Sequence, residues 1–309
     1  VLAAAPSLNP GRNKLLSQKD NFPTDLYMAQ GMSQLMGQSN CELISVAEAD
    51  IIETLDETIG VLMLTQVNFR SGHIHDIKSI TQAAHKKGIL VVWDLAHSAG
   101  VIPVELDECQ VDFAVGCGYK YFNGGPGAPA FIYAAKRYLT NLTQPLSGWM
   151  GHSSPFDFSP EYQKSSSIKQ FLCGTPGVIS MSVLDSALDV FNDISIQCLR
   201  KKSLGLTDLF MSLVKNEPSL NELELITPEA HKERGSQMAY HHKDAYAICQ
   251  ALISEGVIAD FRAPDILRFG FSPLFLSYAE VAQSAAVLTR VVSEKIYDTA
   301  EFKARQAVT

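Results

Sequence analysis

VDFAVGCGYKYFNGGPG, residues 111–127, joins a short apolar run to a glycine-rich loop and places Lys120 at the junction. The β-branched and aromatic residues of the run predict a buried strand over 111–117. The glycines after it allow the backbone to approach a ligand closely. A lysine at the end of a buried strand is either a structural anchor or a chemical reagent.

The chain around this stretch alternates apolar runs with segments of helical period from residue 42 to residue 134. We expect strands at 60–66, 89–94, 111–117 and 129–134. Between the first two, Asp76 is a plausible N-cap of a helix that ends at Gly88. This alternation predicts β-α-β units around a mostly parallel sheet.

The pattern changes near Thr175-Pro176, which resembles an N-cap followed by a first-turn proline. A long linking helix then runs through SVLDSALDVFNDI, residues 182–194, so we expect a large domain over 1–175 and a smaller α/β domain over 176–309. In the second domain the pattern predicts strands at 223–227, 235–241 and 265–272, a helix over 243–254, and a last helix opened by a Ser277/Glu280 capping box.

Composition excludes several classes of protein. A net charge of -8 without a long basic block argues against nucleic acid and acidic membranes as partners. No apolar run approaches the roughly 18 residues that a membrane helix needs. The six cysteines contain no C-x-x-C pair and indicate reduced thiols in the cytoplasm. His73 and His75 alternate without further ligands nearby in sequence, so we predict no metal site.

Polar residues follow three of the predicted strands. Asp94 and His97 follow one strand, Tyr119 and Lys120 follow another, and Thr65 ends a third. Ligands of open α/β sheets bind outside the carboxyl ends of the strands. We therefore expect these side chains to converge on one cleft.

A carboxylate at a strand end can keep a ring nitrogen protonated, and a desolvated lysine beside a cation becomes an amine nucleophile. Together these features describe a pyridoxal phosphate site in which Lys120 forms the Schiff base and Asp94 pairs with the pyridinium. Taken singly, each feature has a structural explanation: an exposed loop lysine, a helix N-cap for Asp94, a satisfied polar residue for His97, and an ordinary glycine turn. Spacing alone leaves the function open.

Five longer blocks resemble the kynureninase family over essentially the whole chain: WDLAHSAG (93–100), GCGYKYFNGGPGAPAF (116–131), QPLSGWMGH (144–152), FLCGTP (171–176) and APDILRFGF (263–271). The resemblance implies the pyridoxal phosphate-dependent transferase-like fold, with a mostly parallel sheet flanked by helices and a smaller α/β C-terminal domain. It also implies hydrolysis of L-kynurenine or 3-hydroxy-L-kynurenine to anthranilate or 3-hydroxyanthranilate and L-alanine, in tryptophan catabolism and NAD precursor synthesis.

The resemblance assigns roles to residues of this sequence. It makes Lys120, Tyr119 and Asp94 catalytic, with Tyr119 as proton relay, and Arg268 the residue that binds the substrate's α-carboxylate through a planar bidentate donor. The cofactor contacts that it implies are Phe22, Asp25, Thr65, Asp94, His97, Tyr119, Lys120, Trp149 and Thr175. Trp149 and Thr175 would reach the site from a partner subunit, which implies a homodimer with a shared active site.

The family's members carry an N-terminal segment before the VLAAA stretch that supplies a phosphate-binding turn and an active-site histidine. Without that segment we expect the chain to bind the cofactor weakly or to be inactive. Two alternatives stay open. A sibling enzyme, such as an aminotransferase or cysteine desulfurase, would share Asp94 and Lys120, although a desulfurase needs a mobile cysteine loop. A noncatalytic binding or dimerising protein on the same fold also fits.

Overall fold

The computed structural model describes residues 1–305, which form two compact units that we describe separately. The first unit contains Val1–Gln66, His75–Ala99 and Val104–Val190. The second contains Val67–Ile74, Gly100–Pro103 and the chain from Phe191 onward. This division follows Val190, later than the expected joint near Thr175, and the domain bounds 1–175 and 176–309 stay a prediction.

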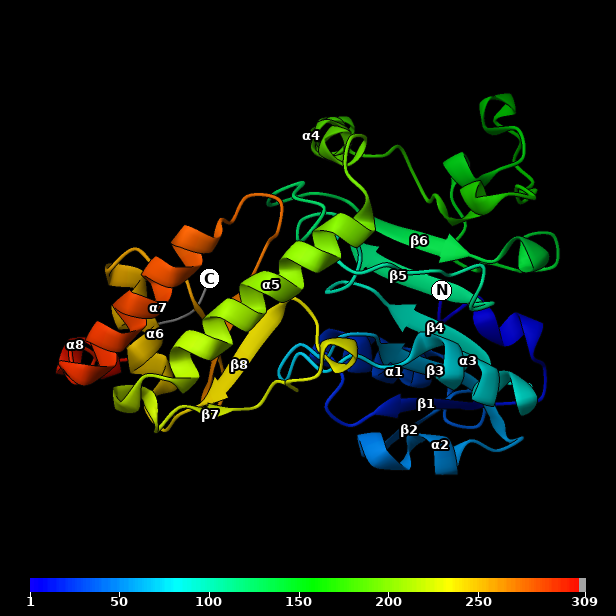
Figure 1. The fold of residues 1–309 in the computed structure, drawn as a ribbon. Coiled ribbons are helices and arrows are strands. Elements are labelled where there is room, and N and C mark those ends of the chain that lie inside the picture. Colours follow the sequence, from blue (N-terminus) through cyan, green and yellow to red (C-terminus); the bar gives the residue numbers. More distant parts are fainter. Residues whose placement is uncertain (306–309) are drawn as a thin grey trace. The chain divides into compact units, whose positions relative to one another are not determined.

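The first unit contains a six-stranded sheet in the order β2-β1-β3-β4-β5-β6 (Figure 1). Its strands are β1 (Lys14–Gln18), β2 (Glu42–Val46), β3 (Ile59–Thr65), β4 (Leu90–Asp94), β5 (Phe113–Cys117) and β6 (Ala130–Ala134). All neighbours are parallel except β5 and β6, which are antiparallel. The mostly parallel sheet is therefore confirmed, and so are the four strands expected between residues 60 and 134.

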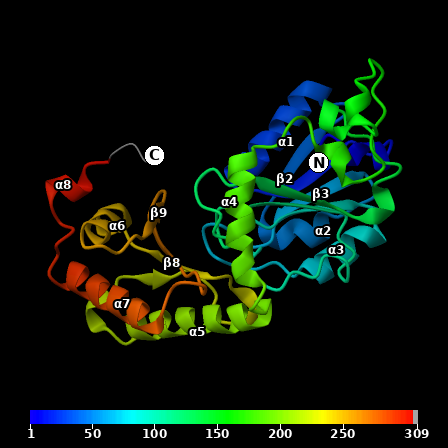
Figure 2. The ribbon, with the colours of Figure 1, turned by 90° about the horizontal axis from the view of Figure 1, so that it is seen from above.

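Helices cover both faces of this sheet, as Figure 2 shows. Leu62 and Leu64 of β3 pack on the side of α2 (Ile51–Thr54) and α3 (Ile77–Lys86). The alternate residues of β3 point to the opposite face, where α1 (Pro23–Met36) contributes its buried Ala29. Burial on both faces explains why β3 reads as a continuous apolar run.

The crossover helix α3 begins and ends as its sequence predicts. Asp76 is the N-cap, and its carboxylate accepts a hydrogen bond from the backbone N–H of Ser79 at 3.1 Å. Gly88 follows the helix with φ at 69°, a left-handed conformation that glycine adopts without steric cost.

One expected helix is wrong in its start and its length. The chain forms α4 (Val178–Leu188) and then a separate α5 (Ile196–Lys215). Gly177, not Thr175, occupies the N-cap of α4, because glycine is a poor residue for a first helical turn and a good one just outside it. Before α5, Ser195 caps a new helix by accepting from the N–H of Cys198 at 3.2 Å.

The second unit contains a four-stranded antiparallel sheet in the order β7-β8-β10-β9. Its strands are β7 (Glu224–Leu225), β8 (Gln237–His241), β9 (Asp260–Arg262) and β10 (Ile266–Gly270), and the further helices are α6 (Ala245–Ser254), α7 (Tyr278–Ser293) and α8 (Ala300–Lys303). Phe210 of α5 packs on Tyr240 and Phe269 of the sheet. The capping box of Ser277 and Glu280 at α7 is confirmed, whereas β9 has no counterpart among the predicted strands.

Within residues 1–305, the helices are all too short or too polar to cross a lipid bilayer.

Candidate active site

The carboxyl ends of β3, β4 and β5 position the candidate site. Thr65 and Asp94 are the last residues of β3 and β4, and they pair directly in the parallel register. Lys120 follows the end of β5, whose Val115 is paired with Asp94. Parallel strands therefore bring residues far apart in sequence to one edge of the sheet, as expected for this class of fold.

A threonine hydroxyl links two carboxyl groups in this site. Thr65 Oγ1 lies 3.1 Å from Asp25 Oδ2 and 3.5 Å from Asp94 Oδ2, and it also contacts the amide oxygen of Asn21. The other oxygen of Asp94 accepts a hydrogen bond from the N–H of Ala96 at 2.7 Å. Because a hydroxyl carries one proton, Thr65 can donate to only one of its three neighbours at a time.

Burial makes two adjacent negative charges unfavourable here. Burial and then the charge of Asp94 raise the pKa of Asp25 to about 7. Burial also raises the pKa of Asp94, against the opposing effects of the Ala96 N–H and the charge of Lys120. A buried carboxyl pair of this kind is stabilised by a cation beside it, so it fits the protonated ring nitrogen of pyridoxal phosphate.

Lys120 lies among groups suited to an amine reagent. Its Nζ is 3.0 Å from Nε2 of the buried His97. The same nitrogen lies 5.9 Å from the ring centroid of Phe22 and 5.5 Å from that of Tyr119. The first unit holds all nine predicted cofactor residues: Phe22, Asp25, Thr65, Asp94, His97, Tyr119, Lys120, Trp149 and Thr175.

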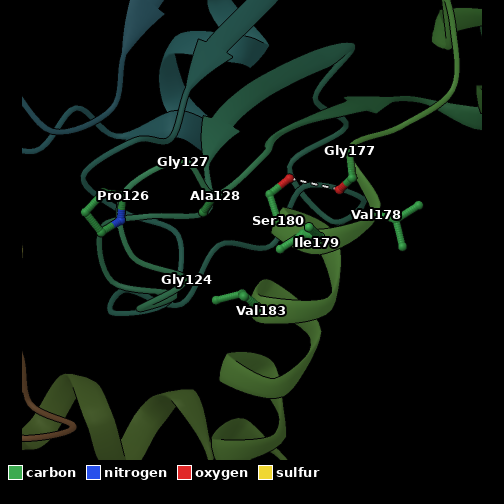
Figure 3. Close-up of a pocket in the computed structure, with 9 residues that line it drawn as sticks. All are labelled: Gly124, Pro126, Gly127, Ala128, Gly177, Val178, Ile179, Ser180 and Val183. Carbon is green, nitrogen blue, oxygen red and sulfur yellow. Dashed lines mark hydrogen bonds between the residues drawn. The ribbon is translucent and has the colours of Figure 1, made fainter.

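The glycine-rich loop after Lys120 is closely packed at Gly124. A Cβ added there would come within 2.8 Å of the Gly118 carbonyl oxygen and 2.9 Å of Leu184, so no larger residue fits without a shift. A cavity of about 430 Å³ lies between this loop and the start of α4 (Figure 3). Its lining consists of Gly124, Pro126, Gly127, Ala128, Gly177, Val178, Ile179, Ser180 and Val183, none of which titrates. The cavity therefore offers apolar contact and no acid–base chemistry.

Three predicted site residues have other surroundings. Trp149 is exposed and packs against Phe156 and Phe158. Thr175 is exposed and precedes α4. Arg268 lies on β10 in the second unit, where its guanidinium donates to Asp260 and to the Phe69 carbonyl.

The sequence reasoning missed Asn21, which is buried in the site. Its amide oxygen accepts from Thr65 and, at 2.8 Å, from the N–H of Phe22, while its amide nitrogen donates to Ser17 at 3.1 Å. Asn21 follows β1 closely, so the rule that selected Thr65 and Asp94 would have selected it too, had β1 been predicted.

Solved structures similar to this chain share one fold. A cysteine desulfurase from Thermococcus onnurineus NA1 matches with a TM-score of 0.77 at 18% identity, covering 95% of this chain and 76% of that one. An alanine–glyoxylate aminotransferase from Nostoc sp. matches with a TM-score of 0.70 at 15% identity, covering 94% and 78%. Fold and site together define a fold type I enzyme that depends on pyridoxal phosphate.

Comparison of sequences gives the family. The model of the kynureninase C-terminal domain matches residues 199–288. The kynureninase of Deinococcus radiodurans is 48% identical over 294 residues, covering 95% of this chain and 71% of that protein. The kynureninase of Pseudomonas fluorescens is 41% identical over 313 residues, covering 100% and 75%. This chain belongs to the kynureninase family.

Proposed function

We propose that this protein hydrolyses L-kynurenine, or its 3-hydroxy derivative, to anthranilate or 3-hydroxyanthranilate and L-alanine in tryptophan catabolism. The observation that carries the proposal is the group of Lys120, His97 and the Asp25–Asp94 pair, in a chain of this family. Aminotransferase or desulfurase activity is not favoured, because those enzymes match at only 15–18% identity.

The first unit supplies the groups that would hold the cofactor. Pyridoxal phosphate, when bound, supplies an electron sink for negative charge at the substrate carbon beside the amine. Asp94 would keep the ring nitrogen protonated, with Asp25 and Thr65 beside it in the same hydrogen-bonded group. Phe22 would stack on the ring, and the amine of Lys120 would hold the cofactor covalently.

We assign proton transfer to Lys120 and Tyr119. The amine of Lys120, hydrogen-bonded to His97, is placed to take the proton from the substrate α-carbon as a general base. Tyr119 is half exposed and adjacent to Lys120, which suits a relay of protons between site and solvent. Arg268 would bind the substrate carboxylate through two parallel N–H donors, a geometry that lysine does not offer.

We also propose a homodimer in the cytoplasm, with Trp149 and Thr175 completing the partner's site. The six free cysteines support a reducing compartment. Helix α4 supports the dimer, because Val178, Ile179 and Val183 are exposed and the helix has no buried residue in the described chain. Exposed apolar surface of this kind marks an interaction site.

Replacing Lys120 by alanine tests the function directly. We expect turnover to fall by roughly 10²–10⁴-fold or more, because the general base is lost, and the absorbance band of the covalently held cofactor to disappear. Anthranilate fluorescence after addition of kynurenine measures turnover, and sulfide release from cysteine tests the desulfurase alternative. Exposed Lys136, changed to alanine, is the matched control. Retention of both turnover and the band by Lys120→Ala would refute the assignment.

A further inference from the structure

Three aromatic rings form a cluster on the surface of the first unit. The Phe158 ring stacks on Trp149 at 6.3 Å with an interplanar angle of 17°. The Phe156 ring meets the same indole edge-on at 5.7 Å and 83°, and it contacts Phe158 at 6.4 Å. Each side chain stays exposed, at 41% for Trp149, 72% for Phe156 and 76% for Phe158. The two phenylalanines therefore restrict the indole without burying it.

The base of this segment is fixed by backbone hydrogen bonds. Ser153 N–H donates to Gln163 at 2.7 Å, and Ser165 N–H donates to Gly151 at 2.9 Å, on either side of an antiparallel bridge between His152 and Lys164. The Tyr162 hydroxyl also donates to the Gly151 carbonyl at 3.1 Å. Phe156 and Phe158 thus lie within a closed hairpin, and Trp149 lies just before it.

The backbone of Phe158 has an unfavourable conformation for its side chain. Its φ is 49° and its ψ 33°, the left-handed region, where a bulky residue is an outlier and glycine or asparagine is favoured. Glycine or asparagine at this position would allow the same turn with less backbone strain. A strained residue with an exposed ring indicates a constraint other than stability of the turn.

We propose that Phe158, with Phe156, is a positioning residue that holds the indole of Trp149 in the orientation needed at the cofactor site. The proposal rests on the proposed function, in which Trp149 reaches the cofactor region of the partner subunit. The phenylalanines act through Trp149, since stacking and edge-to-face contacts fix the plane of the indole. Their removal should free the indole while leaving the hairpin closed.

The test replaces Phe158 by asparagine, which tolerates the left-handed backbone but lacks the ring. Trp93, the other tryptophan, is fully buried, so acrylamide quenching of the cofactor-free protein reports mainly Trp149. We expect stronger quenching and no lower melting temperature. The dissociation constant for pyridoxal phosphate should rise about two- to tenfold, which corresponds to the loss of one aromatic contact. Phe158→Tyr should restore wild-type quenching and affinity.

Two further variants separate the possible failures. Phe275→Asn removes a phenylalanine of similar exposure, 67%, from the second unit and should change neither quenching nor cofactor affinity. If Trp149→Ala weakens cofactor binding but Phe158→Asn changes neither quenching nor cofactor affinity, the positioning role is overturned and the role of Trp149 stands. If Trp149→Ala leaves cofactor affinity unchanged, the proposed role of Trp149 is wrong and the positioning proposal falls with it.

Discussion

At the scale of single residues, the site contains more hydrogen-bond acceptors than donors. Asp25, Asp94 and Asn21 present oxygen atoms to Thr65, whose hydroxyl has one proton to give. The remaining contact between the two carboxyl groups is favourable only when one of them is protonated. Burial and then the charge of Asp94 raise the pKa of Asp25 to about 7, in line with this requirement. The cofactor-free site therefore binds a proton that a positively charged ring would replace.

This binding of a proton predicts a pH dependence for the stability of the cofactor-free protein. The folded pKa of Asp25 is raised above its unfolded value of 3.8, so the folded state binds the extra proton between these two values. Stability from this group is therefore fully present below pH 3.8 and is lost as pH rises through about 7. Asp25→Asn should remove this component and flatten the fall in melting temperature between about pH 4 and 7.

The control for that experiment is Asp50→Asn, which neutralises an exposed carboxylate just before α2. It should keep the wild-type slope of melting temperature against pH. An Asp25→Asn protein with an unaltered slope would show that the buried carboxyl pair does not bind a proton on folding.

At the scale of elements, α7 shows how a local pattern determines a helix start. The Ser277 hydroxyl accepts from the N–H of Glu280, and the Glu280 carboxylate accepts from the N–H of Ser277 at 2.7 Å. These reciprocal bonds satisfy backbone donors that the first turn leaves free. They also lower the pKa of Glu280, chiefly through the bond from the Ser277 N–H.

Ser277→Ala should destabilise the second unit by about 1 kcal/mol, the usual cost of losing an N-cap side chain. Chemical denaturation followed by circular dichroism measures this change. Ser284→Ala is the matched control, because its hydroxyl bonds a carbonyl within the same helix at 2.8 Å and alanine favours a helix interior. If both variants lost the same free energy of unfolding, the capping box would contribute no stability of its own.

The elements that sequence could predict are those with strong local signals. Long apolar strands such as β3, and the caps at Asp76 and Ser277, follow directly from residue pattern. The short strand β1, with the sequence KLLSQ, has too few apolar residues to be recognised, and Asn21 was missed with it. The start of α4 has two candidate N-cap residues, Thr175 before Pro176 and then Gly177. The local sequence does not distinguish them, and in the folded chain Gly177 is the N-cap.

At the scale of the whole molecule, the convergence of Thr65, Asp94, His97 and Lys120 was predictable because it follows from the topology of a parallel sheet. The surroundings of Arg268 were not, since its hydrogen bond to Asp260 joins separate strands of the second unit. Helical period likewise identifies the α4 region as a helix but says nothing of what covers it. The roles of the site residues remain predictions.

The exposed face of α4 leads to the last prediction, which concerns assembly. Large aliphatic side chains of a helix are normally buried, yet α4 exposes Val178, Ile179 and Val183, and the side chain of Ile179 is 84% exposed in the single chain. If α4 lies in a dimer interface, Ile179→Glu buries a charge there and should shift the protein from dimer to monomer in analytical ultracentrifugation. Cofactor affinity should fall with it, because Trp149 and Thr175 would no longer reach a partner site. Ile258 in the second unit is 80% exposed, and Ile258→Glu should change neither the oligomeric state nor the cofactor affinity. A monomeric wild type, or an Ile179→Glu dimer with full affinity, would contradict the shared site.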